Sequence, residues 1–172
     1  MTIVEIIRAF GRDLPVGIVI TDASIERPGP TIVYANSAFG HLVGRDLNEI
    51  IGQTPRFMQG KETRRATLDA FHHALRVGER FHGFLTNYRA DGTKYRAEID
   101  CRPLSNVLGK VEGFIAFERE VVRRIGRPFE THGGRYGAVS TSNDLLGDAL
   151  RGLGVFSSSE ADLRPLEPKE IL

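Results

Sequence analysis

The stretch GQTPRFMQGKETRRATLDAFHHAL, residues 52–75, decides how this sequence folds. Its second half begins a segment typical of a helix, from Glu62 to Val77. The apolar face of that segment repeats at the i, i+3, i+4 and i+7 positions, occupied by Leu68, Phe71, His72 and Leu75. Because such a face must be buried, we expect the helix to cover a layer made by the rest of the chain.

Strand-like runs flank this helix on both sides. Two precede it, Val16 to Asp22 and Thr31 to Asn36, with a proline- and glycine-containing loop between them. Three follow it, Arg80 to Arg89, Lys94 to Pro103 and Val111 to Glu120, joined by the turn signals ADGT and SNVLGK. This order predicts an α+β fold, a five-stranded antiparallel sheet with short helices over one face that enclose a ligand pocket.

The ends of the chain are predicted to lie outside this unit. Residues 1–14 form an amphipathic helix in which apolar side chains recur at helical spacing. Residues 15–120 form the single domain. Residues 121–172 form an extension that begins basic and glycine-rich, holds a short helix near 142–153 and is then expected to be disordered.

Composition excludes several classes of function. The 23 basic and 22 acidic residues leave a formal charge of +1, so we expect no nucleic-acid or membrane partner. The single cysteine, Cys101, rules out an internal disulfide, and the absence of a signal peptide or membrane-spanning run predicts a cytoplasmic protein. No nucleophile and base stand out together, so we expect no enzymatic activity.

Between residues 15 and 120 the sequence resembles the LOV subclass of the PAS superfamily. The resemblance is carried by residues 52–75, by TNYRADGTKYRAEIDCRPLSN and by GFIAFERE. The family motif GxNCRFLQ, followed by a GxETxRAT-like stretch, is matched here by Gly52, Arg56, Phe57, Gln59, Gly60, Glu62, Thr63, Arg65, Ala66 and Thr67. The resemblance implies the PAS fold.

The resemblance also implies a cofactor and a role. Family members hold FMN, and FAD is the less favoured alternative here. The implied function is that of a sensory module that reports blue light or redox state to an unidentified signalling protein by conformational change. A homodimer formed through the opening helix and the outer face of the sheet is expected.

Part of the implied flavin site is retained in this sequence, although about half of its polar contacts are absent. Arg56 matches the arginine that pairs the phosphate, and Gln59 matches a ribityl or phosphate contact. Thr21 and Asn87 fall where the family contacts the ring and its pyrimidine edge. Apolar walls and neighbouring positions complete the expected set: Thr54, Met58, Leu68, Phe71, Leu75, Ile99, Phe114 and Ala116.

Several expected site positions depart from the family pattern. The reactive cysteine is replaced by Pro55, which has no thiol, so no cysteinyl adduct can form there. His72 replaces the second phosphate arginine, and Ala97 replaces an asparagine at the pyrimidine edge. Glu118 replaces the glutamine that senses the flavin, and desolvation in an apolar pocket should raise its pKa.

Three alternatives stay open at this point. The pocket could be filled by its own side chains, which would make the domain a ligand-free PAS interaction module. His72 could instead ligate haem, as in oxygen-sensing PAS domains. Cys101 shares a strand face with Ala97 and Ile99, so it is either a relocated photoactive thiol or a small buried hydrophobe.

Overall fold

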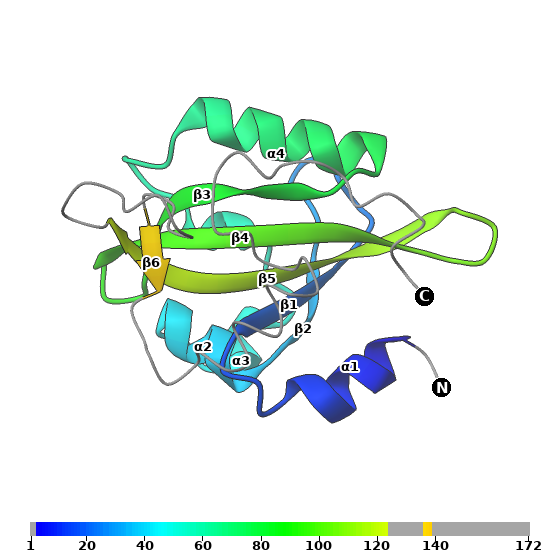
Figure 1. Ribbon diagram of the computed structural model, residues 1–172, viewed down its shortest axis with the longest axis horizontal. Helices are drawn as coiled ribbons and strands as arrows, with labels where there is room; N and C mark the ends of the chain where they lie inside the picture. The colour runs from blue at the N-terminus through cyan, green and yellow to red at the C-terminus, as the bar shows by residue number, and fades with distance from the viewer. Residues whose placement is uncertain (1–2, 124–135, 139–172) are drawn as a thin grey trace, which may run out of the picture.

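A computed structural model describes residues 3–123 and 136–138 of the chain (Figure 1). The helical elements are α1 (Ile3–Gly11), α2 (Ser37–Val43), α3 (Leu47–Ile50), the short 3-10 helix η1 (Pro55–Met58) and α4 (Arg65–Val77). The strands are β1 (Gly17–Asp22), β2 (Ile32–Ala35), β3 (Phe81–Tyr88), β4 (Lys94–Ser105), β5 (Val111–Arg123) and β6 (Tyr136–Ala138).

One antiparallel sheet organises these elements. Its strands lie in the order β2-β1-β5-β4-β3, and β6 pairs with the far end of β5. The first strand of the chain therefore pairs with β5, with Val19 opposite Ala116 and Thr21 opposite Phe114. This pairing places the two N-terminal strands beside the C-terminal hairpin, with β2 and β3 at opposite ends of the strand order.

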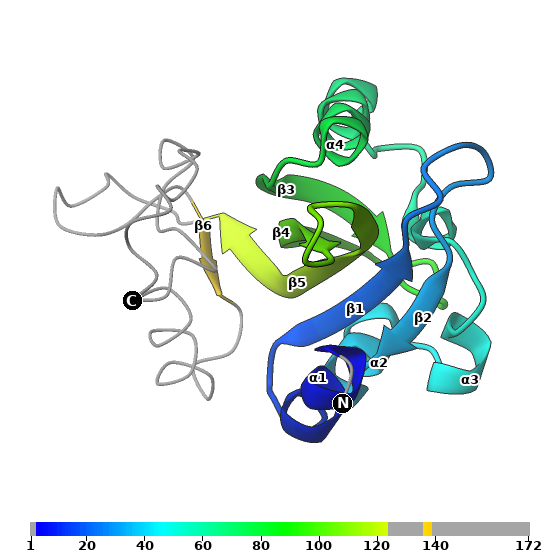
Figure 2. The ribbon, with the colours of Figure 1, turned by 90° about the vertical axis from the view of Figure 1, so that its right-hand side faces the viewer.

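The two faces of the sheet bury different sets of side chains. On the inner face, alternate residues of β1, β4 and β5 pack under α2, η1 and α4, as in Val19, Cys101 and Phe114. On the outer face, Ile18 and Ile20 lie in a second cluster that includes Ile7 of α1. Figure 2 shows α1 beside β1 and β2, away from α4.

Helix α4 forms where the sequence predicts it. Leu68, Phe71 and Leu75 pack against the inner core, and the ring of Phe71 stacks on Phe81 of β3 with centroids 4.2 Å apart. The helix ends at Gly78, whose φ of 71° is left-handed and favours glycine. The apolar periodicity of residues 68–75 therefore does fix which side of α4 faces the sheet.

The segment before α4 is held against β3 by the residues of its GKET sequence. Thr63 Oγ1 accepts a hydrogen bond from the Gly60 backbone N–H at 2.9 Å and donates to the Thr86 carbonyl at 2.7 Å. A side chain at Gly60 would overlap the ring of Tyr88, so this position needs glycine. Lys94 adds an ion pair to Glu62 at 2.8 Å. These contacts give the motif a structural role in placing α4 over the sheet.

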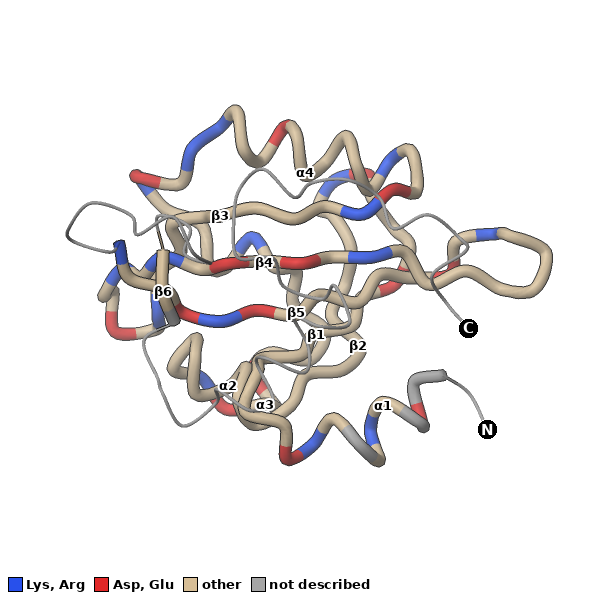
Figure 3. The backbone as a smooth tube through the Cα atoms, in the orientation of Figure 1, with Lys and Arg blue, Asp and Glu red and all other residues tan. Residues whose placement is uncertain are grey.

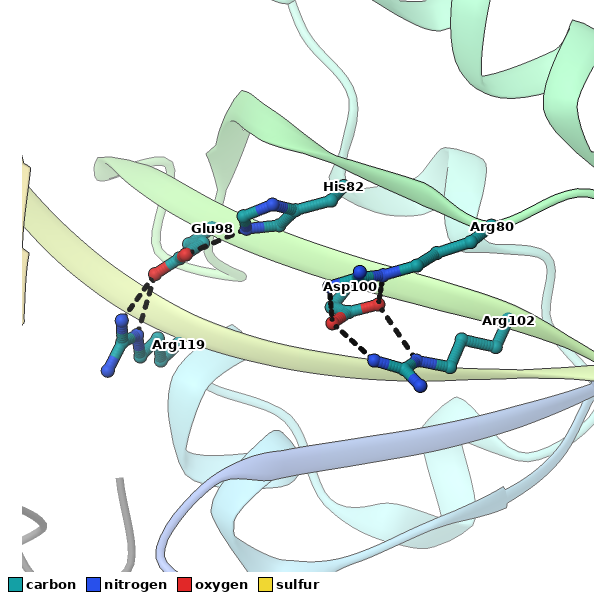
Figure 4. A network of polar contacts seen from close by, with 6 residues as sticks. All are labelled: Arg80, His82, Glu98, Asp100, Arg102 and Arg119. Atoms are coloured by element: carbon teal, nitrogen blue, oxygen red, sulfur yellow. Dashed lines mark hydrogen bonds and ion pairs between the residues drawn. The ribbon is translucent and has the colours of Figure 1, made fainter. Parts of the chain in front are cut away.

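Figure 3 marks charged residues along the central strands β4 and β5. Glu98 of β4 accepts from Arg119 Nε at 2.7 Å and lies 2.8 Å from His82 Nε2. Asp100 accepts from the Arg80 guanidinium at 2.7 and 2.9 Å and also contacts Arg102 (Figure 4). Both carboxylates are buried, and each is paired on two sides, which offsets much of the cost of burial.

The predicted α+β architecture is confirmed, with one addition. The sheet has a sixth strand, β6, in the segment that the sequence suggested was an irregular extension. Strand β5 also continues three residues past Glu120. The helix expected near 142–153 and the disordered end lie outside the described residues. Among the helices that the structure describes, none is long and apolar enough to cross a membrane.

Candidate functional site

A cavity of about 410 Å³ lies between the inner face of the sheet and α4. Its walls come from β1, β4 and β5, from η1, from α4 and from the loop between β1 and β2. Exposed residues such as Arg56 and His72 line it on one side, so the cavity reaches the surface there. Its volume lies within the range of about 300 to 1,000 Å³ that is usual for small-molecule pockets.

Most of the predicted site residues line this cavity. They are Thr21, Thr54, Pro55, Arg56, Gln59, Leu68, Phe71, His72, Leu75, Cys101, Phe114, Ala116 and Glu118. Met58, Asn87, Ala97 and Ile99 are buried in the core instead and are not part of the cavity wall. The structure therefore places at the cavity the residues expected to contact the phosphate and the apolar ring. It does not place there the residues expected at the pyrimidine edge.

Two of these buried residues, Met58 and Asn87, form a small cluster with Tyr95. Met58 Sδ lies 3.9 Å from Asn87 Nδ2 and 3.7 Å from the hydroxyl of Tyr95, so it accepts weak hydrogen bonds from both. Tyr95 is 3% exposed, and burial is the main cause that raises the pKa of its phenol. The methionine and tyrosine side chains thus cover the amide of Asn87, which the sequence alone did not reveal.

Glu118 and Cys101 form the polar part of the sheet wall. They are diagonal neighbours on adjacent strands, because Cys101 pairs with Ala116 and Ile99 with Glu118. Glu118 is 3% exposed, and its Oε2 has no hydrogen-bond partner among the described residues. Burial raises the pKa of the Glu118 carboxyl to about 8 and also raises the pKa of the Cys101 thiol. Both groups are therefore protonated near neutral pH.

At the mouth of the cavity, Arg56 forms a hydrogen bond with the loop between β1 and β2. Its Nε donates to the Pro28 carbonyl at 2.6 Å. Arg56 is on η1, whose first residue is Pro55, a position that favours proline because its missing N–H needs no partner there. His72 is an exposed residue of α4 at the same opening. The described residues contain no cluster of three His, Cys, Asp or Glu side chains that could hold a metal ion.

The cavity also contains residues that the sequence reasoning missed. Val19 precedes Thr21 by two positions, and Arg65 and Asp69 lie one turn or less from Leu68, so strand and helix periodicity could have found them. The remaining residues belong to a loop without a periodic pattern: Ile25, Glu26, Arg27 and Pro30.

The residues present fit a flavin in part. Apolar side chains line the cavity, a guanidinium lies at its mouth, and the buried Oε2 of Glu118 lacks a partner within the described part of the chain, as expected of a group that faces a polar ligand atom. The buried pyrimidine-edge position Asn87 would have to separate from Met58 to reach a ring. The fit is good at the mouth and walls and incomplete at the inner end.

Comparison with known protein families matches residues 5–121 to the PAS fold. Among curated relatives, a bacterioopsin transcriptional activator from Halobacterium salinarum is 30% identical over 141 residues, which is 82% of this chain and 20% of that protein. Phototropin-2 from Oryza sativa subsp. japonica is 35% identical over 103 residues, 60% of this chain and 11% of that protein. The chain thus spans a fifth or less of these two relatives.

A solved structure shares the arrangement of the sheet and helices. The LOV domain of a blue-light activated histidine kinase from Erythrobacter litoralis is 27% identical and superposes with a TM-score of 0.58, covering 62% of this chain and 96% of that domain. The fold and the resemblance to LOV domains, both predicted from the sequence, are therefore confirmed.

Proposed function

This chain belongs to the PAS-fold family, and on that premise we propose that it is a sensory domain that binds FMN and reports blue light or redox state without a cysteinyl adduct. One observation carries the proposal: a cavity with apolar walls has a guanidinium, Arg56, at its mouth and a buried carboxyl without a partner among the described residues, Glu118, on its sheet side. Its signalling partner is expected to be a protein, as is usual for sensory modules.

Each of these groups has a role that follows from its position. Arg56 would pair the phosphate, and the side chains of Leu68, Phe71 and Phe114 would pack on the ring. When bound, the flavin supplies light absorption and electron transfer. Below pH about 8 the Glu118 carboxyl is neutral and can donate a hydrogen bond to a ring acceptor.

A change at Glu118 could pass to the other side of the sheet through β5. The next residue, Arg119, faces outward and binds the buried Glu98, which in turn contacts His82 of β3 (Figure 4). Successive residues of a strand point to opposite faces of the sheet. A shift of β5 that changes the hydrogen bonds of Glu118 on the inner face therefore also moves Arg119 on the outer face. The outer face is where we propose that a partner, or a second copy of the chain, senses the change.

Replacing Arg56 by alanine is expected to weaken FMN binding by about ten- to a hundredfold, since a hydrogen bond to a charged group contributes about 1.5 to 3 kcal/mol. The measurement is the visible absorption of flavin retained by protein purified from cells supplied with riboflavin, followed by titration with FMN. Arg64→Ala, which removes an exposed arginine outside the cavity, is the control. Equal retention by both variants and the unmodified protein would contradict the assignment of Arg56.

Cys101 is expected to be dispensable for any light response. The chain has no other cysteine, and burial raises the pKa of this thiol and so lowers its reactivity. In Cys101→Ala and Cys101→Ser, the visible absorption of the bound flavin should therefore bleach under blue light and recover as it does in the unmodified protein. Absorption spectroscopy measures both steps. Loss of the response in both variants would instead favour a relocated photoactive thiol.

A ligand-free interaction module is the second candidate function. The contacts of Met58 with Asn87 and Tyr95 favour it, because they fill the inner end of the expected flavin site with the chain's own side chains. A colourless protein that takes up no added FMN would select this function over the first.

A further inference from the structure

A second hollow, a groove of about 460 Å³, lies between α4 and β3, the last strand in the order of the sheet. Among the residues that the structure describes, it shares no lining residue with the first cavity. Ala66 and Ala70 of α4 line it with small exposed side chains, and Phe81 and Phe84 of β3 add aromatic surface. The groove is therefore large enough and apolar enough for a small molecule with a ring.

One wall of the groove contains a buried imidazole with a free nitrogen. His82 is 5% exposed, and its Nε2 lies 2.8 Å from Oε1 of Glu98. Its Nδ1 is buried and has no hydrogen-bond partner within the described part of the chain. Figure 4 shows that this second nitrogen points away from Glu98. Because His82 lines the groove and Glu98 does not, the free nitrogen is the one that a ligand in the groove can meet.

A guanidinium lies near the same imidazole. The ring of Phe84 neighbours both groups, with its centroid 6.2 Å from that of His82 and 5.9 Å from Cζ of Arg96. Nη1 of Arg96 donates to Thr86 at 3.3 Å, but its buried Nε has no partner among the described residues. Arg64, at the start of α4, is an exposed residue of the same groove. Neither arginine forms an ion pair with a described residue, so the groove carries positive charge.

We propose that this groove binds a small aromatic carboxylate. The two carboxylate oxygens accept hydrogen bonds from Arg96 Nε and His82 Nδ1, and the aromatic ring packs on Phe84 and on the alanines of α4. The imidazole is protonated in this complex, because only the protonated ring donates to Glu98 from one nitrogen and to the ligand from the other. This inference does not depend on the proposed flavin function, since the groove and the cavity have separate described walls.

The test compares benzoate with benzyl alcohol, which carries a similar ring but no charge. NMR titration of the full chain measures both dissociation constants, and benzoate is expected to bind at least about tenfold more tightly. Arg96→Gln should weaken benzoate binding about tenfold and change benzyl alcohol binding by less than about twofold. Benzoate should shift the amide signals of Gly83 and Thr67, which line the groove, and leave that of Cys101 in the first cavity unchanged.

Ala70→Leu tests the groove without changing its charge. The larger side chain fills space at an exposed position of α4, so it should weaken both ligands about tenfold or more while circular dichroism shows the protein folded. Arg76→Gln is the matched control for Arg96→Gln, because it removes an exposed arginine of α4 that does not line the groove. It should leave both dissociation constants unchanged.

Four results overturn the proposal. The first is equal affinity for benzoate and benzyl alcohol, or no saturable binding of benzoate. The second is unchanged benzoate binding in folded Ala70→Leu or Arg96→Gln. The third is an equal loss in Arg76→Gln and Arg96→Gln, which would mean attraction by net charge alone. The fourth is binding of inorganic phosphate as tightly as benzoate, or signal shifts confined to the first cavity.

Discussion

Replacing Asn36 by alanine is expected to lower the free energy of unfolding by about 3 to 5 kcal/mol, as the sum of one lost helix cap and several unpaired buried groups. Asn36 is 2% exposed, and its side chain joins three segments. Its Oδ1 accepts from the N–H groups of Ile18 at 2.8 Å and Phe39 at 3.0 Å. Its Nδ2 donates to the carbonyls of Gly11 and Val16, both at 2.9 Å.

The size of this effect follows from what alanine leaves behind. The N–H groups of Ile18 and Phe39 would lose the amide as partner, and so would the carbonyls of Val16 and, at 3.3 Å, Leu14. The Gly11 carbonyl would keep only the Leu14 N–H at 3.4 Å, and α2 would lose its N-cap. A loss of this size is a large part of the total stability of a domain, which is about 5 to 15 kcal/mol.

Urea unfolding followed by circular dichroism measures the loss. Asn48→Ala, at an exposed position of α3, is the control and should change the free energy of unfolding by less than about 0.5 kcal/mol. A loss below about 1 kcal/mol in Asn36→Ala would mean that water replaces the amide at little cost and that the link from α1 to the sheet is weaker than the distances indicate.

The strands and α4 could be predicted because their burial repeats regularly along the chain. In β4, Ala97, Ile99 and Cys101 face inward while Glu98 and Asp100 face outward, which is the two-residue period of a strand. The same periodicity, with the family resemblance, located most of the cavity wall. Periodicity assigns a side chain to a face, and the cavity lies on one face only.

What could not be predicted depends on how side chains of different elements meet. Asn87 faces inward as expected, but whether it lines a cavity or is covered depends on Met58 and Tyr95, which come from other segments. The pairing of Glu98 with His82 and Arg119 likewise requires the strand register, which no local pattern gives. The position of Arg27 at the cavity could not be predicted, because loops have no repeat that marks an inward side chain.

Replacing Glu118 by glutamine is expected to change how stability depends on pH. Burial raises the pKa of the Glu118 carboxyl to about 8 from an ordinary value of 4.5. Between these pH values the unfolded chain loses a proton that the folded chain keeps, so the free energy of unfolding falls as pH rises, by about 1.4 kcal/mol per pH unit. Below pH 4.5 and above pH 8 the group contributes no further slope.

Glutamine cannot ionise, so the variant should lack this decline. The stability of Glu118→Gln relative to the unmodified apo protein is therefore expected to increase by about 3 to 5 kcal/mol between pH 4.5 and pH 8 and then to level off. Urea unfolding across this range measures it, and only the change with pH is interpreted, because the amide adds a constant difference of its own. Glu79→Gln, which alters an exposed glutamate after α4, is the control and should show a difference that does not vary with pH. If the Glu118→Gln difference were equally flat, the carboxyl would have to be ionised and solvated in the folded protein, and it could not act as a hydrogen-bond donor to a bound flavin.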